Sequence, residues 1–572
     1  MVKFAIRRKK PNVTAPVASR AGEADAVTYE GGAGFTRDAK SELFLLALTN
    51  MVGEETFYES ARERDRRFAK LVAEVTKADP AWIAAFVPFL RREMHLRSAS
   101  VVMAAEFAHA RRAAATEATE ATEATATDSK ANADGPSTRS VIASALDRAD
   151  EPAELLAYWH QEHGRRMPQP VKRGIADAIG RLFTERAALK YDGQSRVYRM
   201  ADVIDLVHPD PVDARQSAVF KWLLDRRHER EDIAIDAERL PIVAARAELE
   251  AMPLDDRRAL VGAADVGERF KRAGVTWEWL SGWLNGPMDA QAWEAVIPSM
   301  GYMALLRNLR NFDDAAISDA TRASVAAKLT DPAEVASSRQ LPLRFYSAWK
   351  SLSTMHWGDA LERALELSLQ NVPALPGRTL VMVDVSGSMA AAMSNKSKAQ
   401  RWELAALFGA ALATRAEKAD VFAFQSTHTR VDIRNVSSVL RAVDMFKPLV
   451  GGGTNTWPAV RSSFSKHDRV VILTDEQAFF DYRSMPVPAD EIPVPIYTFN
   501  LAGYKTGHLP SGSHQRYTFG GLSDRGFAAI TLLERGRDVG WDDVIKTRPT
   551  SSGTAAAADE AADADDESVE GE

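Results

Sequence analysis

One carboxylate and two hydroxyls follow an apolar segment in the second half of the chain, spaced so that all three can bind one cation. Thr379–Val383 is apolar and β-branched without alternation, which predicts a buried parallel strand. Asp384, Ser386 and Ser388 come directly after it, and Gly387 allows a tight turn between them. Ligands of open α/β sheets gather at the carboxyl ends of strands. Because oxygen-only ligands suit a hard divalent cation, the sequence predicts a Mg²⁺ site here.

Two later segments make this prediction more specific. Gly451–Thr456 is a glycine-rich loop that offers hydroxyls before a predicted helix, and Val470–Asp475 is a second apolar strand ending in an aspartate. Each segment alone is typical of a strand or loop ending in a polar turn. Together they resemble the metal-ion-dependent adhesion site (MIDAS) of von Willebrand factor A domains, whose pattern is DxSxS, then Thr, then Asp. The resemblance implies five ligands: Asp384, Ser386, Ser388, Thr454 and Asp475.

Hydrophobic periodicity divides the chain into a helical part and an α/β part. Residues 37–370 follow mostly helical periodicity in segments of 10–18 residues, which predicts stacked helix pairs of the HEAT type. Pro373, Pro376 and Gly377 mark a boundary, after which strands and helices alternate as in a doubly wound α/β domain. The predicted strands are 381–385, 420–425, 469–475 and 494–500, and the predicted helices are 398–418, 437–446, one from about 457, and 523–533.

Composition and charge limit what kind of protein this is and how its remaining segments behave. The chain has 572 residues and no cysteine, which excludes disulfides and thiolate metal sites and fits a reducing cytoplasm. No apolar stretch is long enough to cross a membrane. The tail from Thr554 carries eight acids and no base, so removing it changes the formal net charge from −7 to +1. We predict a basic flexible N-terminus over 1–29, a disordered Ala-Thr-Glu-rich insertion over 113–140 and a disordered acidic tail over 546–572.

A helical array followed by an A domain with an intact metal motif resembles the Ro 60-kDa autoantigen family, whose helical part is the TROVE module. The resemblance places TROVE over 30–370 and the A domain over 376–545, and it implies a helical ring closed by the A domain. It also implies binding of small noncoding Y RNA on the outside of the ring, binding of 3′ single-stranded ends of misfolded RNA in its hole, and association with an exoribonuclease through the RNA. It rests, besides the metal motif, on these segments: Glu54–Tyr58, Phe89–Arg92, His95–Ser98, Val275–Leu280, Trp293–Val296 and Met300–Leu309.

A local excess of basic residues gives independent support for an RNA surface. Residues 163–199 contain nine Lys and Arg against three Asp and Glu, a local balance of +6. Such charge binds backbone phosphates, although a solvated basic helix face has the same composition. The predicted RNA contacts on the outer surface are Lys172, Arg173, Arg181, Lys190, Arg196 and Arg199. Those assigned to the hole are Arg92, His95, Arg97 and Arg307, for which salt bridges between repeats are the alternative.

Catalytic motifs are absent from the sequence. It contains no phosphate-binding GxxxxGK[ST] loop, no HExxH and no GxSxG. Five metal ligands leave about one open position, which in A domains takes a carboxylate from a protein partner. We therefore expect a non-enzymatic, monomeric RNA-binding scaffold. The alternative is a protein–protein adaptor whose metal binds a partner carboxylate.

Overall fold

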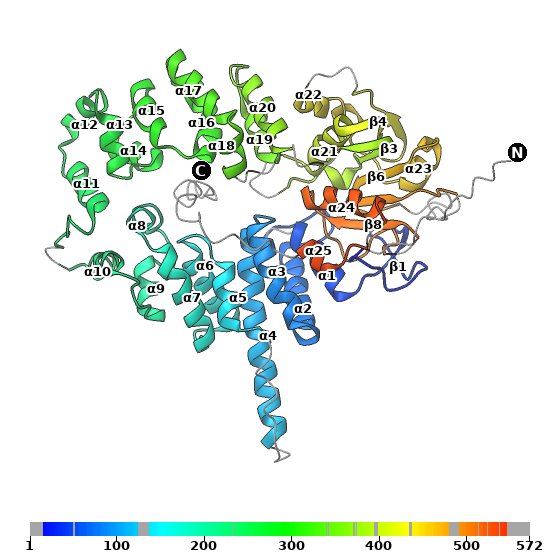
Figure 1. Ribbon diagram of the computed structural model, residues 1–572, viewed down its shortest axis with the longest axis horizontal. Coiled ribbons are helices and arrows are strands. Elements are labelled where there is room, and N and C mark those ends of the chain that lie inside the picture. The colour runs from blue at the N-terminus through cyan, green and yellow to red at the C-terminus, as the bar shows by residue number, and fades with distance from the viewer. Residues whose placement is uncertain are drawn as a thin grey trace, which may run out of the picture. The chain divides into compact units, whose positions relative to one another are not determined.

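The structure is a computed structural model in which the chain forms two compact units (Figure 1). Described residues of Met1–Ala78 and Leu369–Arg548 make up the first, here called the α/β unit. Those of Asp79–Ser368 make up the second, the helical unit. The structure describes residues 15–49, 52–123, 136–230, 233–338, 340, 342–369, 372, 374–393, 399–433, 438–479, 491–512, 514–522, 524–536 and 538–545.

The α/β unit contains a six-stranded sheet in the order β5-β4-β3-β6-β7-β8. All neighbouring pairs are parallel except β4–β5, which is antiparallel at one edge. The first strand of this sheet along the chain is β3. Strands β4 and β5 follow on one side of β3, and β6 then pairs with the other side of β3. This order creates a topological switch between β3 and β6, and it confirms the doubly wound prediction. The strands are β3 (Leu375–Asp384), β4 (Ala416–Phe424), β5 (His428–Arg430), β6 (Arg469–Thr474), β7 (Ile496–Asn500) and β8 (Arg516–Gly520).

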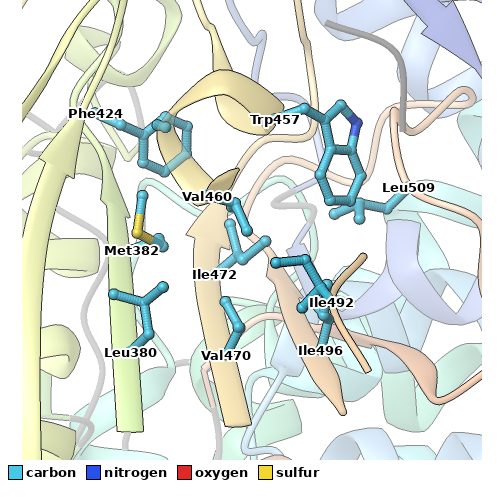
Figure 2. Close-up of a cluster of buried hydrophobic side chains, with 11 residues drawn as sticks. Leu380, Met382, Phe424, Trp457, Val460, Val470, Ile472, Ile492, Ile496 and Leu509 are labelled. Atoms are coloured by element: carbon cyan, nitrogen blue, oxygen red, sulfur yellow. The ribbon is translucent and has the colours of Figure 1, made fainter. Parts of the chain in front are cut away.

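Alternate residues of the central strands form a buried core on one face of this sheet. Figure 2 shows Leu380 and Met382 of β3 beside Val470 and Ile472 of β6, with Val460 packed over them. Val460 belongs to α23 (Thr456–Ser463), so that helix covers this face. These strands read as continuous apolar runs because the sheet is buried on both sides.

The opposite face is covered by α21 (Arg401–Arg415) and α24 (Asp524–Glu534). Phe527 of α24 packs against both Phe499 of β7 and Phe408 of α21, with ring centroids 4.5 and 5.6 Å apart. In α21, Gly409 lies directly on the strands, since a Cβ built there would be 2.7 Å from Val383 Cγ2. The remaining helical segments of this half are η2 (Gly387–Ala390), α22 (Val439–Asp444), η3 (Lys447–Leu449) and α25 (Trp541–Ile545).

The N-terminal segment also belongs to the α/β unit, which corrects the predicted helical domain of 30–370. It contains β1 (Ala26–Val27), β2 (Ala33–Gly34), α1 (Ala39–Thr49) and α2 (Ala61–Ala78), and β1 and β2 form a small antiparallel hairpin. Residues 41–47 of α1 are all buried, and Phe44 packs against Trp541 with ring centroids 5.2 Å apart. Because α1 is apolar on nearly all sides, it needs this cover, and helical periodicity alone does not tell which unit supplies it.

The helical unit consists of short helices, neighbours of which pack side by side, as α3 does with α4 and α5 with α7. This confirms the predicted helical stacking. The predicted ring concerns how the two units are placed, so it stays a prediction. The helices are α3 (Pro80–Arg92), α4 (Arg97–Glu123), α5 (Thr138–Ala145), α6 (Glu151–His163), α7 (Gln169–Leu182), α8 (Glu185–Tyr191), α9 (Met200–Val207), α10 (Ala214–Arg227), α11 (Pro241–Glu250), α12 (Leu254–Val261), α13 (Val266–Arg272), α14 (Trp277–Leu284), α15 (Ala290–Val296), η1 (Ile297–Ser299), α16 (Tyr302–Asp314), α17 (Asp319–Leu329), α18 (Pro332–Ser338), α19 (Pro342–Ser351) and α20 (Gly358–Ser368).

The predicted disordered insertion over 113–140 is wrong at both ends. Helix α4 continues to Glu123 and extends beyond its neighbours in Figure 1, and α5 begins at Thr138. Residues 124–135 lie outside the described residues. The first part of the repeat is helical because alanine is the strongest helix former and glutamate is a good one. Residues 15–29 of the predicted flexible N-terminus are described and include β1, whereas residues 1–14 and the acidic tail of 546–572 lie outside the described residues.

Candidate cation site and basic surface

The two aspartates of the predicted metal site lie at neighbouring strand ends, on either side of the topological switch. Asp384 is the last residue of β3, and Asp475 directly follows β6. The pairing of Val383 with Leu473 brings these ends together, and Thr474 Oγ1 donates a hydrogen bond to Asp384 Oδ2 at 2.5 Å. The strand order thus places both carboxylates where ligands bind in open α/β sheets.

Backbone hydrogen bonds bring the remaining predicted ligands to the same edge. The amide of Ser386 donates to Asp384 Oδ1 at 2.9 Å, and the hydroxyls of Ser386 and Ser388 are 3.3 Å apart. The glycine-rich loop is joined to this segment by two amide–carbonyl bonds, from Gly387 to Gly452 at 2.9 Å and from Gly451 to Val385 at 2.8 Å. All five predicted ligands are buried. The structure therefore brings the three predicted segments together.

The electrostatics of this cluster suit a cation. Asp384 and Asp475 are both 0% exposed, and Asp475 Oδ2 has no hydrogen-bond partner among the residues that the structure describes. Burial raises the pKa of Asp384 well above its ordinary value, and the nearby charge of Asp475 raises it further. Burial also raises the pKa of Asp475. Two buried carboxylates, one with an unpaired oxygen, are costly without a counter-charge, and hard cations take oxygen ligands of this kind. The residues present therefore fit a divalent cation.

A buried ion pair that the sequence pattern does not predict supports the backbone next to Asp475. Glu476 has a left-handed backbone with a φ of 61°. Its carboxylate accepts hydrogen bonds from Arg37 at 2.6 and 2.8 Å, and both side chains are 0% exposed. Asn500 also donates to this carboxylate. A lone arginine 439 positions away along the chain gives no local signal, so only the fold shows that it positions the cation site.

In the helical unit, one group of basic residues stands without ion pairs among the described residues. Lys172 is half-buried and Arg173 exposed in the first turn of α7. Arg165 and Lys172 both lower the pKa of His160, after the larger effect of its burial, so both lie near that ring. His160 Nδ1 and the hydroxyl of Tyr198 are hydrogen-bonded at 2.6 Å. We call Lys172, Arg173, Arg165, His160 and Tyr198 the α7 basic surface.

The other basic residues predicted on the outer surface are engaged within the protein. Arg181 lies 3.0 Å from Asp147, and Arg196 lies 3.7 Å from both Asp150 and Glu154. Arg199 pairs with the buried carboxylate of Asp192 and caps α9, and Lys190 lies over the ring of Tyr191 at 5.0 Å. The local balance of +6 is therefore an overestimate, because carboxylates at 147–154 neutralise part of it.

Some of the residues predicted for the ring's hole are also paired with carboxylates within the protein. Arg97 is only 13% exposed and contacts Asp150, Glu151 and Glu154. Arg92 is more exposed and lies 3.4 Å from Asp147. His95 is half-buried with a left-handed φ of 53°, and Arg307 is exposed on α16. Arg97 therefore forms the salt bridges between repeats that were the alternative to an RNA contact.

Comparison with known proteins shows what the helical unit is similar to. The profile of the TROVE domain matches residues 243–357, within the helical unit. Over these residues the chain is similar to TROVE-domain proteins. The chain is 26% identical over 240 residues to a Deinococcus radiodurans protein named RNA-binding protein RO60, a match covering 38% of this chain and 42% of that relative. The chain therefore matches about two fifths of the length of this curated relative.

A solved structure shows the same fold. The crystal structure of the Deinococcus radiodurans Ro protein superposes with a TM-score of 0.56 at 18% identity, covering 87% of this chain and all of that one. At this identity the likeness concerns the fold alone. Among the described residues, no helix combines the length and apolarity that a bilayer span requires.

Proposed function

We propose that this protein is an RNA-binding scaffold of the Ro type. The observation that carries the proposal is the TROVE match in the helical unit, together with the name of the Deinococcus radiodurans relative as an RNA-binding protein. The α7 basic surface supports it, because its lysine and arginines are not neutralised by described carboxylates and an aromatic hydroxyl side chain lies beside them. Phosphates supply much of the affinity for RNA, and aromatic rings stack on unpaired bases.

The finer form of the proposal follows from the resemblance to the family. A small structured Y-like RNA binds the α7 basic surface, and 3′ single-stranded ends of misfolded RNA bind a second region that includes Arg92 and Arg307. The protein acts in the cytoplasm as a monomer, and an exoribonuclease reaches it through the bound RNA. The α/β unit binds Mg²⁺ through Asp384, Ser386, Ser388, Thr454 and Asp475.

Crosslinking of the tagged protein to RNA in its own cells, followed by sequencing, tests the RNA proposal. A parallel sample carries Lys172→Glu and Arg173→Glu. The matched control carries Arg181→Glu and Arg196→Glu, which change the net charge equally but alter residues already paired with carboxylates. We expect one or a few small structured RNAs to be enriched with the unaltered protein and lost in the first variant. Background RNA in all samples would overturn the proposal.

A protein–protein adaptor is the second candidate function. The observation that favours it is the set of exposed aromatic side chains in the α/β unit: Tyr29, Phe57 and Phe479 are 50%, 57% and 46% exposed. Phe479 lies four residues after Asp475, and aromatic residues are enriched at protein interfaces. In this function the cation binds a partner's Asp or Glu. Protein crosslinking with and without Mg²⁺ tests it: a partner captured with Mg²⁺, and lost with Asp475→Asn, supports the adaptor.

A further inference from the structure

A buried carboxylate in the helical unit holds an exposed histidine in one orientation. Asp313 lies near the C-terminal end of α16, and its side chain is only 3% exposed, whereas that of His356 is 53% exposed. His356 belongs to the short connection between α19 and α20, and its Nδ1 lies 3.2 Å from Asp313 Oδ1. The indole of Trp357 also donates to Oδ1, at 3.0 Å, and the hydroxyl of Thr354 donates to Oδ2 at 2.5 Å. One carboxylate therefore anchors three side chains of this connection.

These contacts decide which ring nitrogen of His356 carries the proton. Nδ1 lies 3.2 Å from two oxygens, Asp313 Oδ1 and Thr354 Oγ1. The hydroxyl proton of Thr354 is already donated to Asp313, so the Thr354 oxygen can only accept a hydrogen bond from the ring. Nδ1 is therefore the donor, and Nε2 of the neutral ring carries a lone pair. No described residue bonds to Nε2, and the ring is half exposed, so this acceptor is open to a ligand.

A metal ion is not the ligand that this nitrogen fits. Histidines that bind metals are often held by a carboxylate in the same way. A metal site needs further ligands, however, and within the described part of the chain no three His, Cys, Asp or Glu side chains gather as such a site requires. The ligand that suits Nε2 is therefore a group that donates a hydrogen bond, such as a hydroxyl or an amine.

Two exposed arginines on α16 lead along the helix toward Asp313. Arg310 lies one turn before Asp313, and Arg307 lies one turn before Arg310. Arg310 is 3.9 Å from Asp314, but both of these side chains are more than half exposed, and such exposed pairs contribute little. Arginines at this spacing suit the phosphates of a nucleic-acid strand. A strand that follows them reaches the end of α16 where His356 is anchored.

We propose that His356 Nε2 accepts a hydrogen bond from a ribose 2′-hydroxyl of single-stranded RNA, and that this contact distinguishes RNA from DNA. The proposal rests on the proposed RNA-binding function and deepens it. Phosphates are common to both nucleic acids, so the arginines alone give no such selection. The 2′-hydroxyl is the group that DNA lacks, and a nitrogen that can only accept is suited to read it. Asp313 is a positioning residue, because it holds the ring and its proton from the buried side.

The test compares binding of RNA and DNA strands of one sequence to the full chain. The probe is a short, fluorescein-labelled single strand that contains only A and C, made once as RNA and once as DNA, and anisotropy gives the two dissociation constants. Because the bases are identical, the ratio of these constants reports the sugar. A net hydrogen bond corresponds to about a threefold to tenfold preference for RNA. We expect His356→Phe to lose this preference through weaker binding of RNA, with DNA binding unchanged.

His228→Phe is the matched control. His228 is as exposed as His356 and also lies beside a carboxylate, but it uses Nε2 for that contact, 3.0 Å from Asp205 Oδ2. We expect this variant to keep the RNA preference of the unaltered protein. Nitrogen-15 NMR of the unaltered protein with labelled histidines gives a second measurement. It should show His356 protonated at Nδ1, with an Nε2 signal that shifts when the RNA strand is added and not when the DNA strand is added.

The outcomes separate this contact from RNA binding itself. If the unaltered protein binds neither strand, the proposed RNA-binding function fails and the role of His356 fails with it. If the protein binds RNA and DNA equally, or if His356→Phe keeps the preference, RNA binding stands and the role of His356 is overturned. A His356 ring protonated at Nε2 also overturns it, because that nitrogen is then a donor. Loss of the preference in His356→Phe but not in His228→Phe supports the proposal.

Discussion

Replacing Lys172 and Arg173 by glutamine should lower the salt dependence of RNA binding, whereas an equal change of charge nearby should not. Both residues lie at the start of α7, and neither has an ion pair among the described residues. Arg181 and Arg196 lie in the same part of the sequence but contact carboxylates at 147, 150 and 154. The two double variants change the net charge of the protein equally. They differ only in how many basic side chains without an ion pair are available to bind RNA phosphates.

The expected magnitude follows from counterion release. Each phosphate contact contributes about 0.7 to 0.9 to the slope of log K against log salt concentration, depending on whether the RNA is single-stranded or duplex. Two lost contacts make the slope shallower by about 1.4 to 1.8. Between 50 and 200 mM salt this corresponds to about a sevenfold to twelvefold smaller change in affinity. For the control, Arg181→Gln with Arg196→Gln, we expect a slope within about 0.3 of the unaltered protein.

Fluorescence anisotropy of a labelled hairpin RNA with a single-stranded 3′ end measures both slopes, at KCl concentrations between those two limits. The comparison is internal, because long-range repulsion changes equally in the two variants. Equal slope changes in the two double variants would refute the reasoning, since ion pairing would then not decide which basic side chains bind phosphate. No change in either would remove the α7 basic surface from the RNA interface.

Three further predictions concern the α/β unit. Burial raises the pKa values of Asp384 and Asp475 in the cation-free protein, so the stability they contribute is present at low pH and lost as pH rises through the raised pKa values. The melting temperature should therefore fall relative to Asp475→Asn as the pH rises from about 4 to about 7, the pKa of Asp384 in the folded protein, and Mg²⁺ should remove that fall. Arg37→Met leaves the buried carboxylate of Glu476 without its counter-charge and should cost about 3–5 kcal/mol, measured by hydrogen exchange of the sheet amides. Gly409→Ala should cost about 1–3 kcal/mol in the same assay, because its methyl group meets a strand valine.

The α/β part of the fold could be predicted because its signals are local. The predicted strand 469–475 corresponds to β6, and the predicted 494–500 to β7, each within two residues at either end. Strand β8 was missed although all five of its residues are buried, because it begins with Arg516 and is preceded by Gly, Ser and His. The alternation of Tyr517 and Phe519 was the available signal. Strand β5 is exposed throughout, so no apolar pattern marks it.

The location of the basic surface could not be predicted as well as the strands, because a count of charged residues along the sequence ignores which of them form ion pairs in the fold. Nine bases in residues 163–199 were expected to make one basic surface. In the structure, helix α6 and the segment before it bring acidic residues from 147–154 against Arg97, Arg181 and Arg196. Buried or half-buried arginines need such partners, whereas exposed ones do not. Exposure and pairing therefore separate structural arginines from candidates for phosphate binding, and Arg165, Lys172 and Arg173 of the α7 basic surface are among the candidates.

The cation site shows where sequence reasoning ends within a single motif. Each predicted ligand lies at a strand end or in the loop beside it, so its neighbours in sequence are enough to identify it. The position of the loop after Asp475 depends instead on contacts such as Tyr29 with Gln477 and Arg37 with Glu476, which join residues 448 and 439 positions apart. The motif therefore identifies the predicted ligands, whereas the contacts that hold the loop after Asp475 come from distant parts of the chain.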